Sequence, residues 1–161
     1  MDGRTIAVGL VLRSVLLIFS ALALTVEAQC QTLPPKKPQA TPEKVVAEHF
    51  AALHACDWNR MMSGYDDNIA FLSNGELVSG RQAVGEMFKK VLQPHSKGGL
   101  CGMKLTPEKT IVVGDTVNVV FRFDAPFFAE PYRGSEAFET RNGLVVVQIT
   151  TFDQSALKMK N

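Results

Sequence analysis

The stretch HACDWNRMMSGYDDNIAFLSNGELVSGRQAV, residues 54–84, contains the features that decide the fold. Asp57 is placed to cap a short helix over residues 58–65, because aspartate accepts hydrogen bonds from the first free N–H groups of a helix. Asn74-Gly75 predicts the tight turn of a small hairpin over residues 68–79, since both residues tolerate positive φ. Ser79-Gly80 then begins a helix over residues 81–92, which Pro94 ends. A helix, a hairpin and a helix in succession indicate a mixed α and β domain.

The residues before this stretch predict one longer helix. Thr41 is a suitable N-cap and Pro42 suits the first helical position. From there Val45, His49 and Leu53 recur at helical spacing on one face, which continues to Cys56. We therefore expect an amphipathic first helix of about four turns.

The residues after residue 92 predict strands. Four segments qualify, at residues 100–113, 116–125, 132–141 and 144–153, with turns at Gly114-Asp115 and Asn142-Gly143 and a bulge near Thr106-Pro107. Three helices followed by an antiparallel sheet form an α+β layer architecture. In the last strand the alternation places Val145, Val147 and Ile149 together on one face. Because both faces of that strand are apolar, we expect a homodimer through the sheet.

The N-terminal residues predict export. Arg4 and Arg13 precede the apolar run 15–26, and Val26-Glu27-Ala28 offers a cleavage site, so residues 1–28 read as a signal peptide. The alternative is an uncleaved anchor. After cleavage we expect no stable membrane insertion and a periplasmic or secreted protein. Residues 29–40 are a proline-rich linker, 41–155 the domain and 156–161 a C-terminal tail.

Composition limits the partners. The chain has 161 residues with a net charge of +1 and no block of like charge, so nucleic acid is not an expected partner. No cluster of Cys and His has metal spacing and no glycine run resembles a phosphate loop, so neither a metal nor a cofactor is expected. Three cysteines in an exported chain favour a disulfide between Cys56 and Cys101, with Cys30 left over.

Three motifs carry a family likeness: AALHACDWNRMMSGYDDNIAFL, SGRQAV and AFETRNGLVVVQITTFD. Together they resemble the NTF2-like superfamily and, within it, the SnoaL-like proteins. The resemblance implies a cone, in which three N-terminal helices pack on a curved antiparallel sheet and leave an apolar pocket. It implies little about function, because isomerases, cyclases, dehydratases, hydrolases and plain binders share this scaffold.

The resemblance also suggests site residues. The general base of the ketosteroid isomerases falls on Leu72, which cannot move a proton. Their helix tyrosine falls on His49 and their oxyanion-binding aspartate falls on Glu136. An imidazole and a carboxyl facing each other could share a proton. Each alone could instead be a satisfied boundary residue or a solvated one. Pocket-lining candidates are Trp58, Met62, Phe71, Leu72, Phe88, Phe138, Gln148, Thr150 and Phe152.

Two hypotheses of function remain. The first is an exported protein that binds a small, mostly apolar molecule without a complete isomerase site. The second is a small-molecule isomerase, lyase or cyclase that uses His49 and Glu136 as an acid/base pair. Arg122 with Asp124, and Glu139 with Arg141, alternate along two neighbouring strands and are expected to form cross-strand ion pairs.

Overall fold

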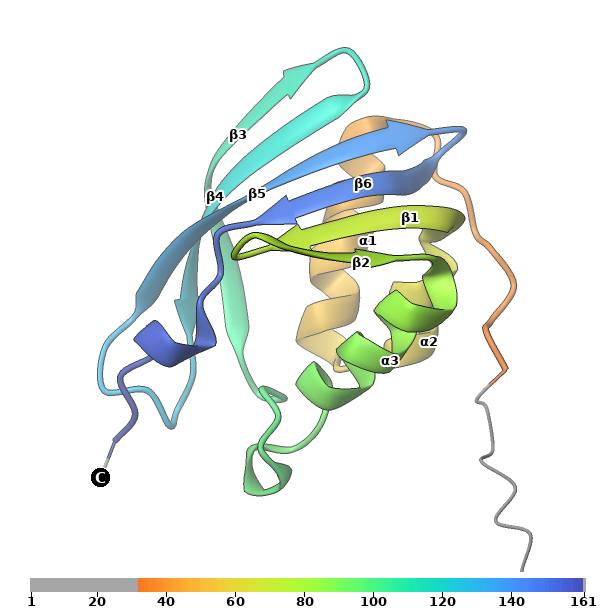
Figure 1. Cartoon of the computed structure of the whole chain (residues 1–161). Helices are drawn as coiled ribbons and strands as arrows, with labels where there is room; N and C mark the ends of the chain where they lie inside the picture. The colour runs from red at the N-terminus through yellow and green to blue at the C-terminus, as the bar shows by residue number, and fades with distance from the viewer. Residues whose placement is uncertain (1–31, 161) are drawn as a thin grey trace, which may run out of the picture. The chain divides into compact units, whose positions relative to one another are not determined.

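The computed structural model describes residues 32–160, so the predicted signal peptide, residues 1–28, lies outside the described residues. Its helices are α1 (Pro42–Ala55), α2 (Trp58–Ser63) and α3 (Arg81–Val91). Its strands are β1 (Tyr65–Ser73), β2 (Glu76–Ser79), β3 (Lys104–Val113), β4 (Thr116–Asp124), β5 (Tyr132–Arg141) and β6 (Leu144–Thr150). The sheet curls around the helices (Figure 1), and the fold is the α+β cone that the sequence predicts.

The helix ends follow the local chemistry of the sequence. The Thr41 hydroxyl accepts a hydrogen bond from the Lys44 N–H at 3.3 Å, and the Asp57 carboxylate accepts one from the Arg60 N–H at 2.9 Å. Cys56 ends α1 in the left-handed conformation, at φ 53°. Capping satisfies N–H groups that the helix itself leaves free. Cys56 and Asp57 thus fix where α1 ends and α2 begins, and this sets the direction of the two helices.

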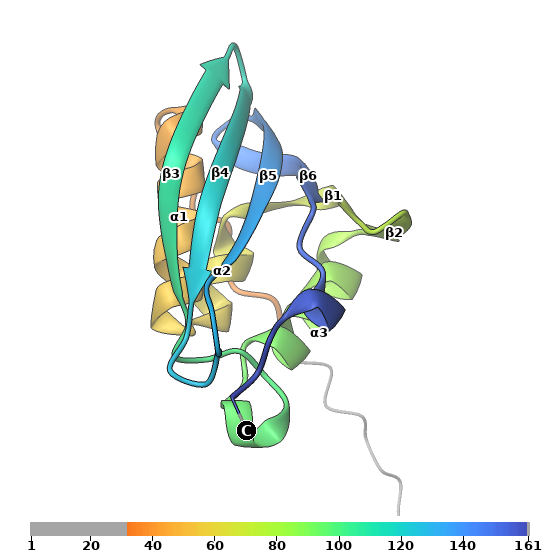
Figure 2. The same cartoon turned by 90° about the vertical axis from the view of Figure 1, so that its left-hand side faces the viewer.

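The six strands form one sheet in the order β2-β1-β6-β5-β4-β3. All neighbours are antiparallel except β1 and β6, which are parallel. The hairpin of β3 and β4 extends beyond the other strands in both views (Figures 1 and 2). Its register shifts between Pro107 and Lys109, where the bulge is predicted. The outer β3 edge carries Pro107 and lysines, which discourage pairing with another strand.

The structure differs from the sequence-based prediction in where β1 begins and in which face of the sheet some β6 side chains reach. Tyr65 starts β1 instead of ending α2, because α2 stops at Ser63 and Gly64 turns the chain into the sheet. In β6 the register shifts between Val145 and Val147, so Val145 points inward and is buried, while Ile149 is 47% exposed. A bulge reverses the side-chain alternation on one side of it. The grouping of Val145 with Ile149 on one face is therefore wrong.

The predicted proline-rich tether is instead packed against the domain from residue 33 onward. The Lys37 N–H donates to the Ser63 carbonyl, the Gln39 N–H donates to the Gly143 carbonyl, and Arg81 donates to the Pro34 carbonyl. Leu33 packs on the core. Gly143 has a φ of +75°, and a Cβ there would clash with Gln39 backbone. Two backbone hydrogen bonds and one from the Arg81 side chain hold this segment in place, and the composition of the segment does not reveal them.

The C-terminal residues also return to the domain. After a short 3-10 helix at Gln154–Ala156, the Ala129 N–H donates to the Lys158 carbonyl and the Lys160 N–H to the Phe127 carbonyl. The predicted C-terminal tail therefore packs on the loop between β4 and β5. Among residues 32–160 no helix is both long and apolar enough to cross a bilayer.

Candidate functional site

A cavity of about 450 Å³ lies between α1, α3 and the inner face of the sheet. Most of its lining is apolar, and its polar residues are found at two ends. His49, Glu136, Gln148 and Thr150 are buried, Ser73 is half-buried, and Asn74, Glu76 and Gln154 are exposed. A volume of this size suits a small organic ligand. The complete lining is His49, Leu53, Phe71, Ser73, Asn74, Glu76, Val78, Met87, Phe88, Val91, Leu100, Met103, Leu105, Phe121, Phe123, Glu136, Gln148, Thr150, Phe152 and Gln154.

The buried polar end is a chain of four side chains from four elements. His49 of α1 lies with its Nε2 3.6 Å from Glu136 Oε2 of β5. Its Nδ1 lies 3.0 Å from the Tyr65 hydroxyl at the start of β1. That hydroxyl donates in turn to Gln148 Oε1 of β6, at 2.5 Å. His49 Nε2 and Glu136 Oε2 have no hydrogen-bond partner within the described part of the chain. Such buried atoms are costly unless they interact with each other or with a bound group.

Burial keeps the Tyr65 hydroxyl protonated. Removal from water first, and the charge of Glu136 second, raise the pKa of Tyr65 well above its usual value near 10. The phenol is therefore a permanent hydrogen-bond donor at neutral pH. Its proton belongs to the link between Tyr65 and Gln148.

Tyr65→Phe is expected to lower the free energy of unfolding by about 1 to 3 kcal/mol near pH 7, because it leaves buried partners unsatisfied. Above pH ~10 the tyrosine of unfolded wild-type protein ionises while the folded one stays protonated, so unfolding becomes easier. The wild type should lose up to about 1.4 kcal/mol per pH unit that the variant does not lose. Urea unfolding of both proteins at pH 8 and pH 11 measures this. An equal difference at both pH values would contradict it.

The structure brings seven of the predicted site residues to the cavity. They are His49, Phe71, Phe88, Glu136, Gln148, Thr150 and Phe152. Trp58 and Met62 lie outside it: the Trp58 indole N–H donates to the Gly85 carbonyl at 2.8 Å, and Met62 is fully buried in the core. Phe138 lies behind His49, with ring centroids 4.9 Å apart, and does not reach the cavity.

Leu72 also lies away from the cavity, and the expectation that it takes the place of a catalytic base is therefore wrong. It pairs with Leu77 of β2 and Ile149 of β6 on the outer face of the sheet. Side chains alternate along a strand, so Phe71 and Ser73 face inward instead. Neither carries a carboxylate. The residues that β1 contributes to the cavity lining are thus Phe71 and Ser73.

Tyr65 is the functional residue that the sequence reasoning missed. Its position after Met62 and Gly64 favoured a helix end, and its two partners, His49 and Gln148, lie 16 and 83 residues away. No local pattern indicates such a contact. Leu100, Met103 and Leu105, which complete the cavity wall, were predicted only as residues of a strand.

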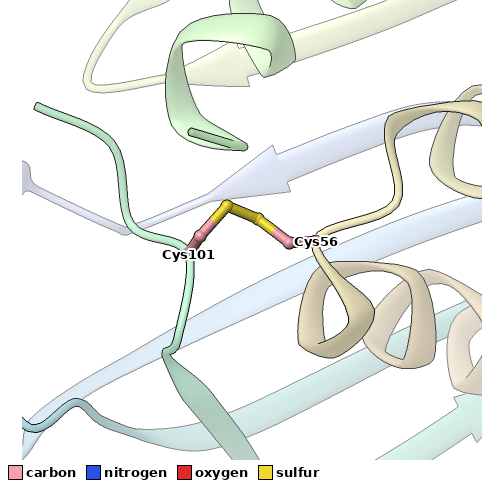
Figure 3. Close-up of a disulfide and its surroundings, with 2 residues drawn as sticks. All are labelled: Cys56 and Cys101. Atoms are coloured by element: carbon pink, nitrogen blue, oxygen red, sulfur yellow. A yellow bond between two sulfur atoms is a disulfide. The ribbon is translucent and has the colours of Figure 1, made fainter. Parts of the chain in front are cut away.

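Cys56 and Cys101 are joined by a disulfide, with their Cα atoms 5.6 Å apart (Figure 3). Cys56 caps α1, and Cys101 lies in the segment before β3. That segment also carries Leu100 and Met103 of the cavity wall. The bridge therefore ties one wall of the cavity to the helix that carries His49.

The charged pairs on β4 and β5 lie apart from the cavity. Arg122 Nε is 2.8 Å from Asp124 Oδ2, and Arg141 Nη2 is 3.1 Å from Glu139 Oε1. Each pair joins neighbours along one strand, so the expected cross-strand pairing is wrong. In the β4–β5 register Arg122 is opposite Arg133, which cannot neutralise it. Residues 32–160 contain no group of three or more His, Cys, Asp or Glu that could hold a metal ion.

The structure is thus a curved sheet packed on three helices, with an apolar cavity that has a buried polar end. The sequence matches the SnoaL-like domain over residues 46–148, and the chain belongs to this family. No curated protein matches the sequence significantly.

Solved structures of similar fold have diverse roles. One is a candidate ketosteroid isomerase from Kribbella flavida, 16% identical, covering 70% of this chain and 78% of that one, with a TM-score of 0.57. A second is a candidate polyketide cyclase from Sinorhizobium meliloti, 16% identical, with coverage of 67% and 94% and a TM-score of 0.56. A third is a computationally designed 17-OHP binder, 15% identical, with coverage of 76% and 99% and a TM-score of 0.61. At these identities the likeness establishes the NTF2-like fold alone.

Proposed function

We propose that the protein binds a small, mostly apolar and uncharged molecule in its cavity without transforming it. The observation that carries the proposal is an apolar cavity of about 450 Å³ with one buried polar end, formed by His49, Glu136 and Gln148. Apolar walls supply affinity through burial, and a few buried polar groups orient the ligand. The ligand's own polar group would lie at that end.

The charges around the cavity favour an uncharged ligand. Two of its lining residues, Glu76 and Glu136, are acidic, and no lysine or arginine is among the described residues that line it. A carboxylate ligand would lose its hydration without gaining an ion pair to a lysine or an arginine. Burying its charge would therefore cost several kcal/mol or more. A ketone, an ester or a hydroxyl loses far less water on entry.

A pair of probes with one ring system tests this proposal. The neutral ketone 2-acetylnaphthalene is expected to bind at least about tenfold more tightly than 2-naphthoate, because only the second must bury a charge. Isothermal titration calorimetry on the full chain measures both. Equal affinities, or tighter binding of the naphthoate, would contradict the proposal.

Glu136 variants test the polar end. Glu136→Gln retains a hydrogen-bond donor and should keep the ketone affinity, whereas Glu136→Leu should weaken it by about 1 to 3 kcal/mol, or roughly 5- to 150-fold. The matched control is Gln154→Leu at the exposed end, which should change ketone binding little. If only Gln154→Leu lost ketone binding, the ligand's polar group would lie at the exposed end of the cavity, and this would contradict the proposal.

A second candidate function is that of a small-molecule isomerase, lyase or cyclase. It is favoured by the separation of 3.6 Å between His49 Nε2 and Glu136 Oε2, which lets the two groups exchange a proton beside the cavity. For an enzyme, His49→Ala and Glu136→Gln should each abolish turnover while substrate binding is largely kept. If the protein only binds its ligand, the wild type should bind the ligand and release it chemically unchanged.

We also propose a homodimer through the outer face of the sheet. Leu72 pairs in register with Leu77 and Ile149, so three large apolar side chains lie side by side, and Leu77 and Ile149 are 62% and 47% exposed. An apolar patch in this position is stabilised when a second copy covers it. Light scattering at micromolar concentration should give twice the mass of the monomer, and Ile149→Lys should give the monomer mass. Ile111→Lys on the β3–β4 hairpin is the control, and a monomeric wild type would contradict the proposal.

A further inference from the structure

The hydrogen-bond chain at the buried end of the cavity indicates which nitrogen of His49 carries a proton. The Tyr65 hydroxyl has one proton and donates it to Gln148 Oε1, a carbonyl oxygen that can only accept. The same hydroxyl oxygen lies 3.0 Å from His49 Nδ1. With its only proton already committed, Tyr65 can only accept from the imidazole. His49 Nδ1 is therefore the donor in this contact.

The other nitrogen of His49 then has a defined role. In a neutral imidazole with its proton on Nδ1, Nε2 carries a lone pair. This Nε2 faces Glu136 Oε2 at 3.6 Å, and both atoms are buried. Two lone pairs held face to face in a buried site repel, so one proton between them is required. It lies on the carboxyl or on the imidazole, and in both cases the pair is neutral overall.

We propose that Tyr65, supported by Gln148, is a positioning residue that fixes the proton of His49 on Nδ1, so that His49 Nε2 and Glu136 share a single proton beside the cavity. The proposal rests on the proposed function for the assignment of this end to the ligand's polar group. The shared proton can be offered to a carbonyl oxygen or withdrawn from it by a small movement. The ligand class it fits is a neutral molecule with a carbonyl, which accepts a hydrogen bond, or with a hydroxyl, which accepts one and donates one.

An alternative arrangement reverses the donor and the acceptor in both hydrogen bonds that link Gln148, Tyr65 and His49. In it, the Gln148 amide donates to the Tyr65 oxygen, Tyr65 donates to Nδ1, and Nε2–H donates to a Glu136 carboxylate. In this arrangement the proton between His49 and Glu136 belongs to Nε2, and the pair carries a net charge of −1 instead of being neutral. The two arrangements are distinguished by whether Nδ1 or only Nε2 of His49 is protonated.

Long-range ¹H–¹⁵N NMR spectra of the ¹⁵N-histidine-labelled full chain, without any ligand, report this directly. We expect the Nδ1 of His49 to have the chemical shift of a protonated nitrogen near pH 7. The chain contains three histidines, and one is an internal reference: His54 Nε2 accepts from the Leu105 N–H at 2.8 Å, so its own proton must also be on Nδ1. An unprotonated Nδ1 in His49, beside the expected His54 pattern, would overturn the proposal.

Two variants test the cause. In Tyr65→Phe, Nδ1 loses its acceptor, and we expect the His49 proton to move to Nε2, where Glu136 accepts it, while His54 is unchanged. In Glu136→Gln, the amide donates to Nε2, so Nε2 should show the shift of a lone-pair nitrogen and Nδ1 should remain protonated. A melting temperature measured for each variant shows that it is folded. An unchanged His49 pattern in folded Tyr65→Phe would overturn the role of Tyr65.

Because these spectra need no ligand, their outcome is independent of the probe titrations. Correct protonation of Nδ1 together with no binding of either naphthalene probe would refute the proposed function alone. Binding of the ketone together with an unprotonated Nδ1 would refute the positioning role alone.

Discussion

Phe138→Ala is expected to lower the free energy of unfolding by about 3 to 5 kcal/mol, one of the two largest effects of any change considered. Phe138 is fully buried, and its ring lies 4.9 Å from the His49 ring and 6.2 Å from the Phe50 ring, centroid to centroid. Removing it would leave a void inside a packed region that cannot collapse. Thermal or urea unfolding of the variant measures the loss.

Phe71 provides the matched comparison. It is nearly as buried as Phe138 and contacts Phe88, but it borders a cavity that already exists. Phe71→Ala should therefore cost clearly less stability than Phe138→Ala and should change the affinity for 2-acetylnaphthalene more. Phe138→Leu, which keeps most of the volume, should cost under about 1.5 kcal/mol. Equal stability losses for the two alanine variants would contradict the distinction between core and cavity wall.

The second large effect is expected from the disulfide. Replacing Cys56 and Cys101 together by serine should lower the free energy of unfolding by roughly 4 kcal/mol, because the bridge closes a loop of 45 residues in the unfolded chain. For a domain of this size the melting temperature should fall by roughly 10 °C or more. Cys30→Ser removes a cysteine without breaking the bridge and is the control.

The same double variant should also weaken ligand binding, since the bridge holds the wall that contains Leu100 and Met103. A disulfide of this kind persists in an oxidising compartment. Titration of thiols in the unreduced, denatured protein should find Cys56 and Cys101 unreactive. Two additional free thiols in that experiment would contradict the bridge.

Residues that act through their neighbours in sequence were predictable. Thr41 and Asp57 cap helices because the N–H groups they accept from lie three residues away. Asn74 and Asn142 adopt positive φ, each followed by a glycine that does the same, as the hairpin turns require. The helices, the strands and most turns follow from such local rules, and so does the α+β class.

The unpredicted features depend on contacts between distant segments. A single irregularity in β1 or β6 decides which face a side chain reaches, and this placed Leu72 outside and Val145 inside. The cavity wall combines residues that are far apart in sequence, from His49 to Gln154. Tyr65 lies behind this wall and contacts it through His49 on α1 and Gln148 on β6. His49 and Glu136 were suggested by the family resemblance. Only the folded structure shows how far apart these two side chains lie and that both are buried.

Trp58 is the sole tryptophan of the chain, and its position has a practical consequence for optical experiments. The indole is held by the Gly85 carbonyl, lies beneath Lys89 and borders no part of the cavity. Its emission should therefore respond strongly when the domain melts and hardly at all when the cavity is filled. A titration that follows tryptophan emission would therefore show no change even when the cavity is fully occupied. A search for ligands should instead measure the shift in melting temperature or the displacement of a fluorescent probe.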